Sequence, residues 1–124
     1  MLREIKHVSQ FPREPFRRWF AGSFMDLFVW YDDQRNITGF QLSYRKGEEE
    51  KSVTWYRDKG FTHETVDDGE ARSGRHKMSP ILVPDGVFDR EDVLDLFQSK
   101  SRPIEPEIVN FVTETLRQCP EDLR

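Results

Sequence analysis

The chain has 124 residues, a length that leaves no room for a second sizeable core. Its aromatic content of 13 % argues against a disordered chain, because aromatic side chains bury enough area to build a core. We therefore expect residues 1–124 to form a single domain. The formal net charge of −4 is spread along the chain, which argues against a nonspecific binder of nucleic acid or of an anionic membrane, since such a protein would be basic.

The N-terminal part carries the weakest structural signals. Residues 3–8 predict an edge strand. Prolines then break regular structure, and an aromatic spacing of i, i+3 and i+4 after Pro15 predicts one or two helical turns there, carried by Phe16, Trp19 and Phe20.

The middle of the chain is typical of strands. Apolar runs and alternating patterns predict them at residues 26–32, 37–46, 51–57 and 61–66. Their connections have hairpin length, and Asp58-Lys59-Gly60 fits a three-residue loop with its glycine in the left-handed region. Connections this short join only antiparallel neighbours, because a parallel return needs a long crossover. We expect a meander of four strands, or five with the edge strand.

The C-terminal third predicts two amphipathic helices. The first follows Asp89, a good N-cap, and ends before Pro103; the second begins at Pro106 and ends before Pro120. Their apolar stripes are Val93, Leu94, Leu96 and Phe97, and then Ile108, Phe111, Val112, Leu116 and Cys119. Because both stripes must be covered, we predict an α+β fold in which an antiparallel β-meander of four to five strands is packed on one face by two C-terminal helices.

The most polar segment holds the first candidate binding residues, which are His63, Asp67, Asp68, Arg72, Arg75, His76 and Lys77. Histidines and carboxylates of this kind bind metals or carry out acid–base chemistry, but their spacing is that of neither a metalloprotease helix nor a calcium loop. A solvated hairpin end, a turn at Asp-Gly and a flexible linker before the helices explain the segment better than a metal or catalytic site does. We assign no catalytic residue, metal ligand or cofactor.

Residues 17–20 and Cys119 are two further candidate sites. Residues 17–20 (Arg-Arg-Trp-Phe) combine cations with rings, as a stacking site for bases would, but the acidic net charge argues against nucleic acid. Cys119 lies on an apolar helix stripe before Pro120, where a buried thiol is inert. Motifs of serine hydrolases, dinucleotide enzymes and dithiol enzymes do not occur in the sequence, which favours a protein that is not an enzyme.

The surplus of rings gives the leading functional hypothesis. Two short helices can cover only one sheet face, so some rings of the meander should face outward, with Trp30 and Trp55 as candidates. We predict a small binding or protein-interaction module that holds a protein partner or a small molecule on this aromatic face, with self-association through the sheet as a hypothesis. The alternative is a metal-assisted enzyme that uses the cluster from His63 to His76.

The expected location of the protein follows from its first residues and its single cysteine. Residues 1–6 lack the apolar stretch of a signal peptide, and 18 uncharged apolar residues nowhere run together, so we expect no membrane contact. One cysteine cannot form an intramolecular disulfide, which fits a reducing compartment. We therefore expect a cytoplasmic protein.

Three central segments carry a resemblance. Residues 17–20 (Arg-Arg-Trp-Phe), 26–32 (Asp-Leu-Phe-Val-Trp-Tyr-Asp) and 37–42 (Ile-Thr-Gly-Phe-Gln-Leu) resemble small bacterial proteins of unassigned function. The resemblance spans about the central half of the chain and implies no activity. No catalytic residue is transferred from it.

Overall fold

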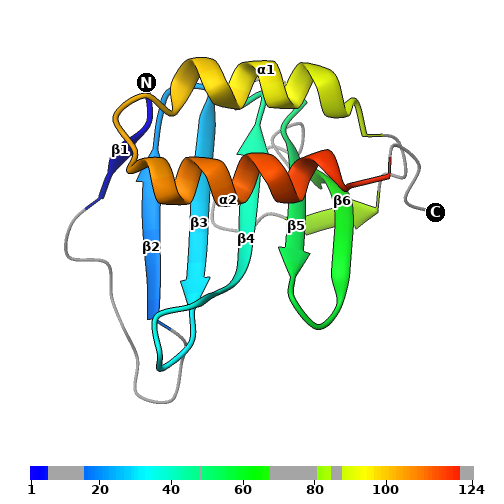
Figure 1. Ribbon diagram of the computed structural model, residues 1–124. Helices are drawn as coiled ribbons and strands as arrows, with labels where there is room; N and C mark the ends of the chain where they lie inside the picture. Colours follow the sequence, from blue (N-terminus) through cyan, green and yellow to red (C-terminus); the bar gives the residue numbers. More distant parts are fainter. Residues whose placement is uncertain (6–15, 48, 68–80, 85–87, 121–124) are drawn as a thin grey trace.

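The fold is built on an antiparallel sheet whose strands follow one another in chain order. The computed structural model describes residues 1–5, 16–47, 49–67, 81–84 and 88–120. Each strand pairs with the next, from β1 at one edge to β7 at the other, which confirms the predicted meander (Figure 1). The strands are β1 (Arg3–Glu4), β2 (Phe16–Ala21), β3 (Met25–Tyr31), β4 (Ile37–Tyr44), β5 (Lys51–Tyr56), β6 (Gly60–Asp67) and β7 (Ile81–Pro84).

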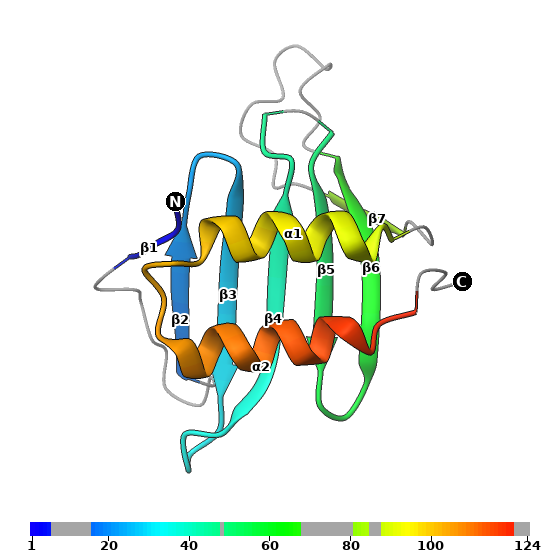
Figure 2. The same ribbon diagram turned by 45° about the horizontal axis from the view of Figure 1, so that its top comes forward.

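Two helices, α1 (Arg90–Lys100) and α2 (Pro106–Arg117), cross the strands on the same face of the sheet, as predicted (Figures 1 and 2). The side chain of Asp89 accepts a hydrogen bond from the backbone N–H of Asp92 and so caps α1. Pro106 occupies the first turn of α2, where its missing N–H costs no helical hydrogen bond. We call the sheet face under these helices the helix face, and the opposite one the far face.

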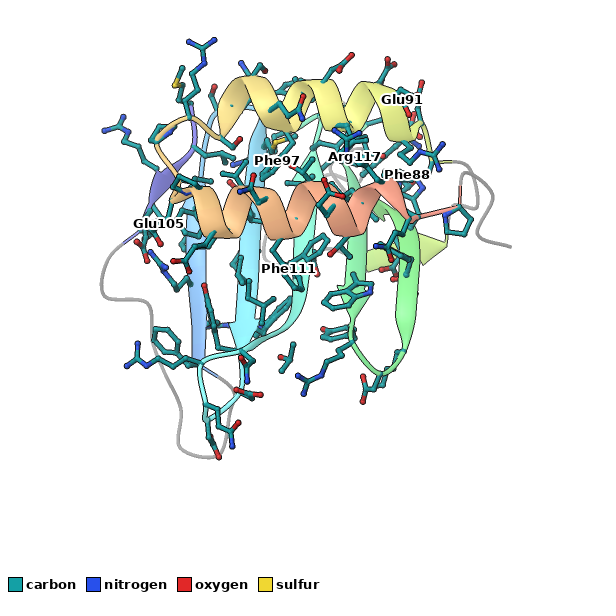
Figure 3. All side chains as sticks on the ribbon, viewed as in Figure 1. Phe88, Glu91, Phe97, Glu105, Phe111 and Arg117 are labelled. Atoms are coloured by element: carbon teal, nitrogen blue, oxygen red, sulfur yellow. The ribbon has the colours of Figure 1, made fainter. Side chains whose placement is uncertain are left out.

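The core fills the space between the helix face and the two helices. Alternate residues of the central strands point into it because successive side chains of a strand point to opposite faces. Phe97 of α1 and Phe111 of α2 lie over the sheet (Figure 3). Fully buried members from both layers are Leu27, Val29, Phe40, Leu42, Val53, Phe97, Val112 and Leu116.

The helical turns predicted after Pro15 are wrong, because residues 16–21 form the strand β2. Every residue of β2 is paired with a residue of β3, from Phe16 opposite Tyr31 to Ala21 opposite Asp26. These interstrand hydrogen bonds decide the local structure, whatever spacing the aromatic residues have. Phe20 is buried on the helix face, whereas Trp19 lies on the far face.

Three of the described hairpin connections hold residues in the left-handed backbone region. Gly60 has φ of +83° and closes the hairpin between β5 and β6, which confirms the predicted loop. Arg35 and Arg45 have φ of +65° and +64°, values that cost a side-chain-bearing residue roughly 1–2 kcal/mol. Arg35 lies in the β3–β4 turn, and Arg45 directly follows β4.

The sheet is wider than the four to five strands predicted. The additional strands are β2 and β7. The strand β7 has four residues, and it pairs with β6 from Glu64 opposite Pro84 to Asp67 opposite Ile81. A run this short, with a proline at its end, is too brief for a period of two to be recognised. Within the described part of the chain, no helix is both long and apolar enough to span a membrane.

Candidate functional site

The polar segment predicted as a site is described only at its beginning. His63 lies on β6, points to the helix face and is 3 % exposed. Asp67 ends the same strand, where its backbone pairs with Ile81. The other five candidates lie outside the described residues; they are Asp68, Arg72, Arg75, His76 and Lys77.

His63 is held by aromatic neighbours on the helix face. Nε2 of His63 and the hydroxyl of Tyr44 share a hydrogen bond of 2.5 Å, and the two rings stack with centroids 6.0 Å apart. Phe88, just before α1, also contacts the imidazole, with a centroid distance of 5.2 Å. Among the described residues, no three His, Cys, Asp or Glu side chains gather closely enough to hold a metal ion.

The two tryptophans predicted to line an exposed face lie on opposite sides of the sheet. Trp55 points to the helix face, where its ring contacts Phe40 at 5.7 Å and the edge of Phe111 at 5.5 Å between centroids. Trp55 therefore belongs to the margin of the core. Trp30 lies on the far face, as its pairing opposite Arg17 of β2 and Gly39 of β4 requires.

Four rings form a continuous row across the far face. Trp19 stacks on Phe28 at 5.5 Å, Phe28 contacts Trp30 at 6.5 Å, and Trp30 contacts Tyr56 at 5.6 Å between centroids. The last contact spans β4, which is possible because Gly39 lies between the two rings and has no side chain.

The row is only partly accessible. Nε1 of Trp19 is buried and has no hydrogen-bond partner among the described residues, whereas Tyr56 is 38 % exposed. Ser52 and Thr54 also point to the far face and are buried. Trp19, Phe28 and Trp30 are half-buried, so the Trp30–Tyr56 end of the row is the more accessible one because it contains Tyr56.

A cavity of about 580 Å³ lies on the helix face beneath α1, at the end of β4 and the start of β5. Its volume is in the range of sites that bind small molecules. Apolar and charged side chains both line it, namely Phe24, Tyr44, Arg45, Lys51, Asp89, Asp92, Val93 and Leu96.

Backbone and side-chain hydrogen bonds fix the walls of this cavity. The backbone N–H of Lys46 donates to the carbonyl of Phe24 at 3.1 Å, which ties the β2–β3 turn to the end of β4. The Lys46 ammonium also donates to the carbonyl of Gly22 and to Asp26, both at 3.0 Å. These bonds fix Phe24 and also Arg45, the residue before Lys46, at the cavity. Its floor is equally fixed, because Tyr44 is bonded to His63.

The charges around the cavity are of both signs. Asp89 is the N-cap of α1 and Asp92 lies in its first turn. A hydrogen bond with the Asp89 carboxyl, followed by the negative charge of Asp89, raises the pKa of Asp92. Lys51 lies 3.5 Å from Glu49. Within the described ranges, Arg45, Asp89 and Asp92 form no ion pair.

The two arginines of residues 17–20 point to opposite faces of the sheet. Arg18 points to the helix face, where it binds Glu4 through two hydrogen bonds of 2.8 and 2.7 Å and Glu105 through two of 2.7 and 2.9 Å. These carboxylates raise the pKa of Arg18 and join β1, β2 and the start of α2 (Figure 3). Arg18 is therefore committed within the fold, while Arg17 lies beside Trp30 on the far face.

Sequence reasoning missed the cavity residues because they are dispersed along the chain. The sequence marks Asp89 only as a helix cap and Arg45 only as a residue of the alternating strand at residues 37–46. One signal was present in the sequence, since Lys46-Gly47 follows a strand and marks a turn at which exposed side chains gather. That turn could not be joined to α1 without a fold.

The described residues form an α+β fold with a cavity on the helix face and an aromatic row on the far face. Comparison of the chain with protein-family models, with curated proteins and with solved structures found no match.

Proposed function

We propose that this protein is a binding module that takes a small molecule in the cavity between α1 and the ends of β4 and β5. The observation that carries this proposal is the convergence of charged and apolar side chains on one space of about 580 Å³. A ligand needs apolar surface for affinity and a few polar groups for orientation, and the lining supplies both. The functional residues are Tyr44, Arg45, Lys51, Asp89 and Asp92.

The hydrogen bonds that fix the cavity walls favour a binding site over a chance gap in the packing. Lys46 joins the two turns that carry Phe24 and Arg45, and Tyr44 is bonded to His63. A preformed site spends little free energy on ordering its own side chains when a ligand enters. Arg45 keeps a left-handed backbone, the kind of strain that persists where the surrounding structure determines it.

Fragment screening by two-dimensional amide NMR tests the proposal. A library of small amphipathic fragments at millimolar concentration should shift the amides of Tyr44, Arg45 and Val93 together. A Leu96→Trp variant, which fills the cavity from α1, should abolish these shifts, while Leu116→Met in the core should leave them. If no fragment shifts the cavity amides, or if Leu96→Trp leaves the shifts unchanged, the cavity is not a binding site.

A second candidate function is association of two copies of the chain through the Trp30–Tyr56 end of the aromatic row. Tyr56 is 38 % exposed, and its surroundings carry charges of both signs, including the Arg57–Asp32 pair at 3.8 Å. Two copies therefore meet there without repulsion between like charges. The rings supply the apolar centre that such interfaces need.

Light scattering at tens of micromolar tests self-association. The wild type should be dimeric and Trp30→Lys monomeric, because a lysine there must be desolvated in the interface. Asn110→Lys adds the same charge on an exposed position of α2 and should remain dimeric. A monomeric wild type would remove this candidate and leave the cavity proposal intact.

The metal-assisted enzyme remains a hypothesis with less support. Its described histidine, His63, is 3 % exposed and packed between Tyr44 and Phe88. Such packing favours a structural role for the imidazole. Thermal unfolding with and without divalent zinc measures the difference, because an enzyme of this kind should gain stability from the metal.

A further inference from the structure

The charge pattern of the cavity restricts the chemistry of its ligand. Arg45 at the end of β4 and Lys51 at the start of β5 contribute positive charge, and Lys51 also lies 3.5 Å from Glu49. Asp89, the N-cap of α1, and Asp92 in its first turn contribute negative charge. All four side chains line the same space, yet no ion pair between these two sets is present in the described part of the chain. The cavity thus keeps its two signs of charge apart.

The apolar lining completes the pattern. Phe24 and the ring of Tyr44 come from the sheet side, and Val93 and Leu96 come from α1. A ligand that lies between them needs an apolar body, because a polar one would leave its own groups without hydrogen-bond partners. Aromatic and aliphatic bodies both fit such a lining.

We infer that the ligand is an apolar zwitterion, an amino acid or a dipeptide with a large apolar side chain, whose ammonium group lies at Asp89 and Asp92 and whose carboxylate lies at Arg45 and Lys51. The inference rests on the proposed function of the cavity as a binding site and adds the chemical class of the ligand. Planar guanidinium and carboxylate groups form paired hydrogen bonds, which suits Arg45 to this role.

The carboxylate pair of α1 supports the ammonium half. Asp89 caps the helix by accepting a hydrogen bond from the backbone N–H of Asp92 at 3.3 Å, which holds the two carboxyl groups beside each other. A hydrogen bond with the Asp89 carboxyl, followed by the negative charge of Asp89, raises the pKa of Asp92. A bound ammonium group between the two acids offsets the repulsion between their charges.

Calorimetric titration with four probes separates the two halves of the ligand. L-Phenylalanine carries both charges, phenethylamine only the ammonium and 3-phenylpropionate only the carboxylate, while the dipeptide Phe-Phe places the charges further apart. We expect one of the two zwitterions to bind at least tenfold more tightly than either half-ligand. The preferred zwitterion decides between an amino acid and a dipeptide.

Two variants assign each charge to its wall. Asp92→Asn should weaken binding of the zwitterion at least fivefold and leave 3-phenylpropionate unaffected, with Asp95→Asn, one turn along the exposed side of α1, as the control. Arg45→Asn should weaken the zwitterion and leave phenethylamine unaffected. Asparagine tolerates the left-handed backbone, and Arg35→Asn is the matched control because Arg35 has nearly the same φ, +65° against +64°.

The outcomes distinguish this inference from the function on which it rests. If a half-ligand binds as tightly as the zwitterions, or if Asp92→Asn and Arg45→Asn leave zwitterion affinity unchanged, the ligand is not a zwitterion although the cavity is a site. If none of the four probes binds while NMR fragments do, the inference again fails alone. If neither probes nor fragments bind, both fail.

Discussion

Replacing Gly39 with alanine tests whether the close packing around β4 sets the stability of the sheet. A Cβ atom at residue 39 would lie 2.8 Å from the carbonyl oxygen of Trp55 and 2.8 Å from Cδ1 of Tyr56. Carbon contacts this short require movement. The ring of Tyr56 can rotate away, but the carbonyl of Trp55 belongs to the backbone of the paired strand β5, so the sheet itself must shift.

The magnitude follows from three opposing contributions. Overpacking in a filled space costs roughly 1–3 kcal/mol, and displacing Tyr56 from Trp30 loses a ring contact of about 0.5–1.5 kcal/mol. Alanine recovers roughly 0.5–1 kcal/mol because it restricts the unfolded chain more than glycine does. We therefore expect Gly39→Ala to lower the free energy of unfolding by about 2 kcal/mol, with the steric cost outweighing the entropic gain.

Urea unfolding followed by circular dichroism measures this loss as a lower midpoint at an unchanged slope. Gly47→Ala is the matched control, because Gly47 has no atom within 4 Å of its would-be Cβ but has φ of +85°, so its cost arises from backbone conformation alone. In a Tyr56→Ala background the ring clash disappears and the cost of Gly39→Ala should fall without vanishing. A midpoint for Gly39→Ala equal to or above the wild type would refute this packing argument.

Three further perturbations test other contacts of the fold. Arg18→Lys should lower the free energy of unfolding by about 1 kcal/mol, because lysine cannot reproduce the paired hydrogen bonds to two carboxylates; an unchanged urea midpoint would contradict this. Tyr44→Phe should cost about 1–3 kcal/mol by leaving the buried Nε2 of His63 without this partner, and stability equal to the wild type would show that the bond contributes nothing. Burial raises the pKa of the Cys119 thiol to about 12, so iodoacetamide at pH 8 should label it only after unfolding, and rapid labelling of the native protein would be the contrary result. The same shift makes the free energy of unfolding fall as the pH rises from the ordinary thiol pKa near 9 toward 12, because the thiol then ionises in the unfolded chain but not in the folded one. Cys119→Ala should reduce this fall when unfolding is measured at pH 9–11.

The layers of the fold could be predicted because each depends on a local period. Alternation over residues 37–46 placed Phe40 and Leu42 on one face, and both are fully buried on the helix face. Pro106 and Asp89 marked the starts of the helices for reasons that act within one turn of chain. Short connections then left antiparallel pairing as the only arrangement of the strands.

Features that depend on pairing between distant segments could not be predicted in the same way. Residues 16–21 carry a helical spacing of rings, yet hydrogen bonds to β3 make them a strand. Trp30 and Trp55 look alike in sequence, but the register of β3, β4 and β5 sends one to the far face and the other to the core. The cavity is the extreme case, because its lining joins the turn before β3 with α1.

The cavity and the core share residues, and this has a thermodynamic consequence. Tyr44 lines the cavity with its ring and binds His63 with its hydroxyl, while His63 packs on Phe88, which directly precedes the cap of α1. A ligand that contacts Tyr44 and Asp89 therefore touches both ends of this connected set, and the set exists only in the folded chain. Its binding free energy must add to the free energy of unfolding, by about 2.7 kcal/mol when the ligand is present at a hundred times its Kd. A mutation that removes a contact within this set, such as Tyr44→Phe, should therefore lower both the affinity for the ligand and the free energy of unfolding. Gly39→Ala lies on the far face and should lower the free energy of unfolding without changing the affinity of the folded protein.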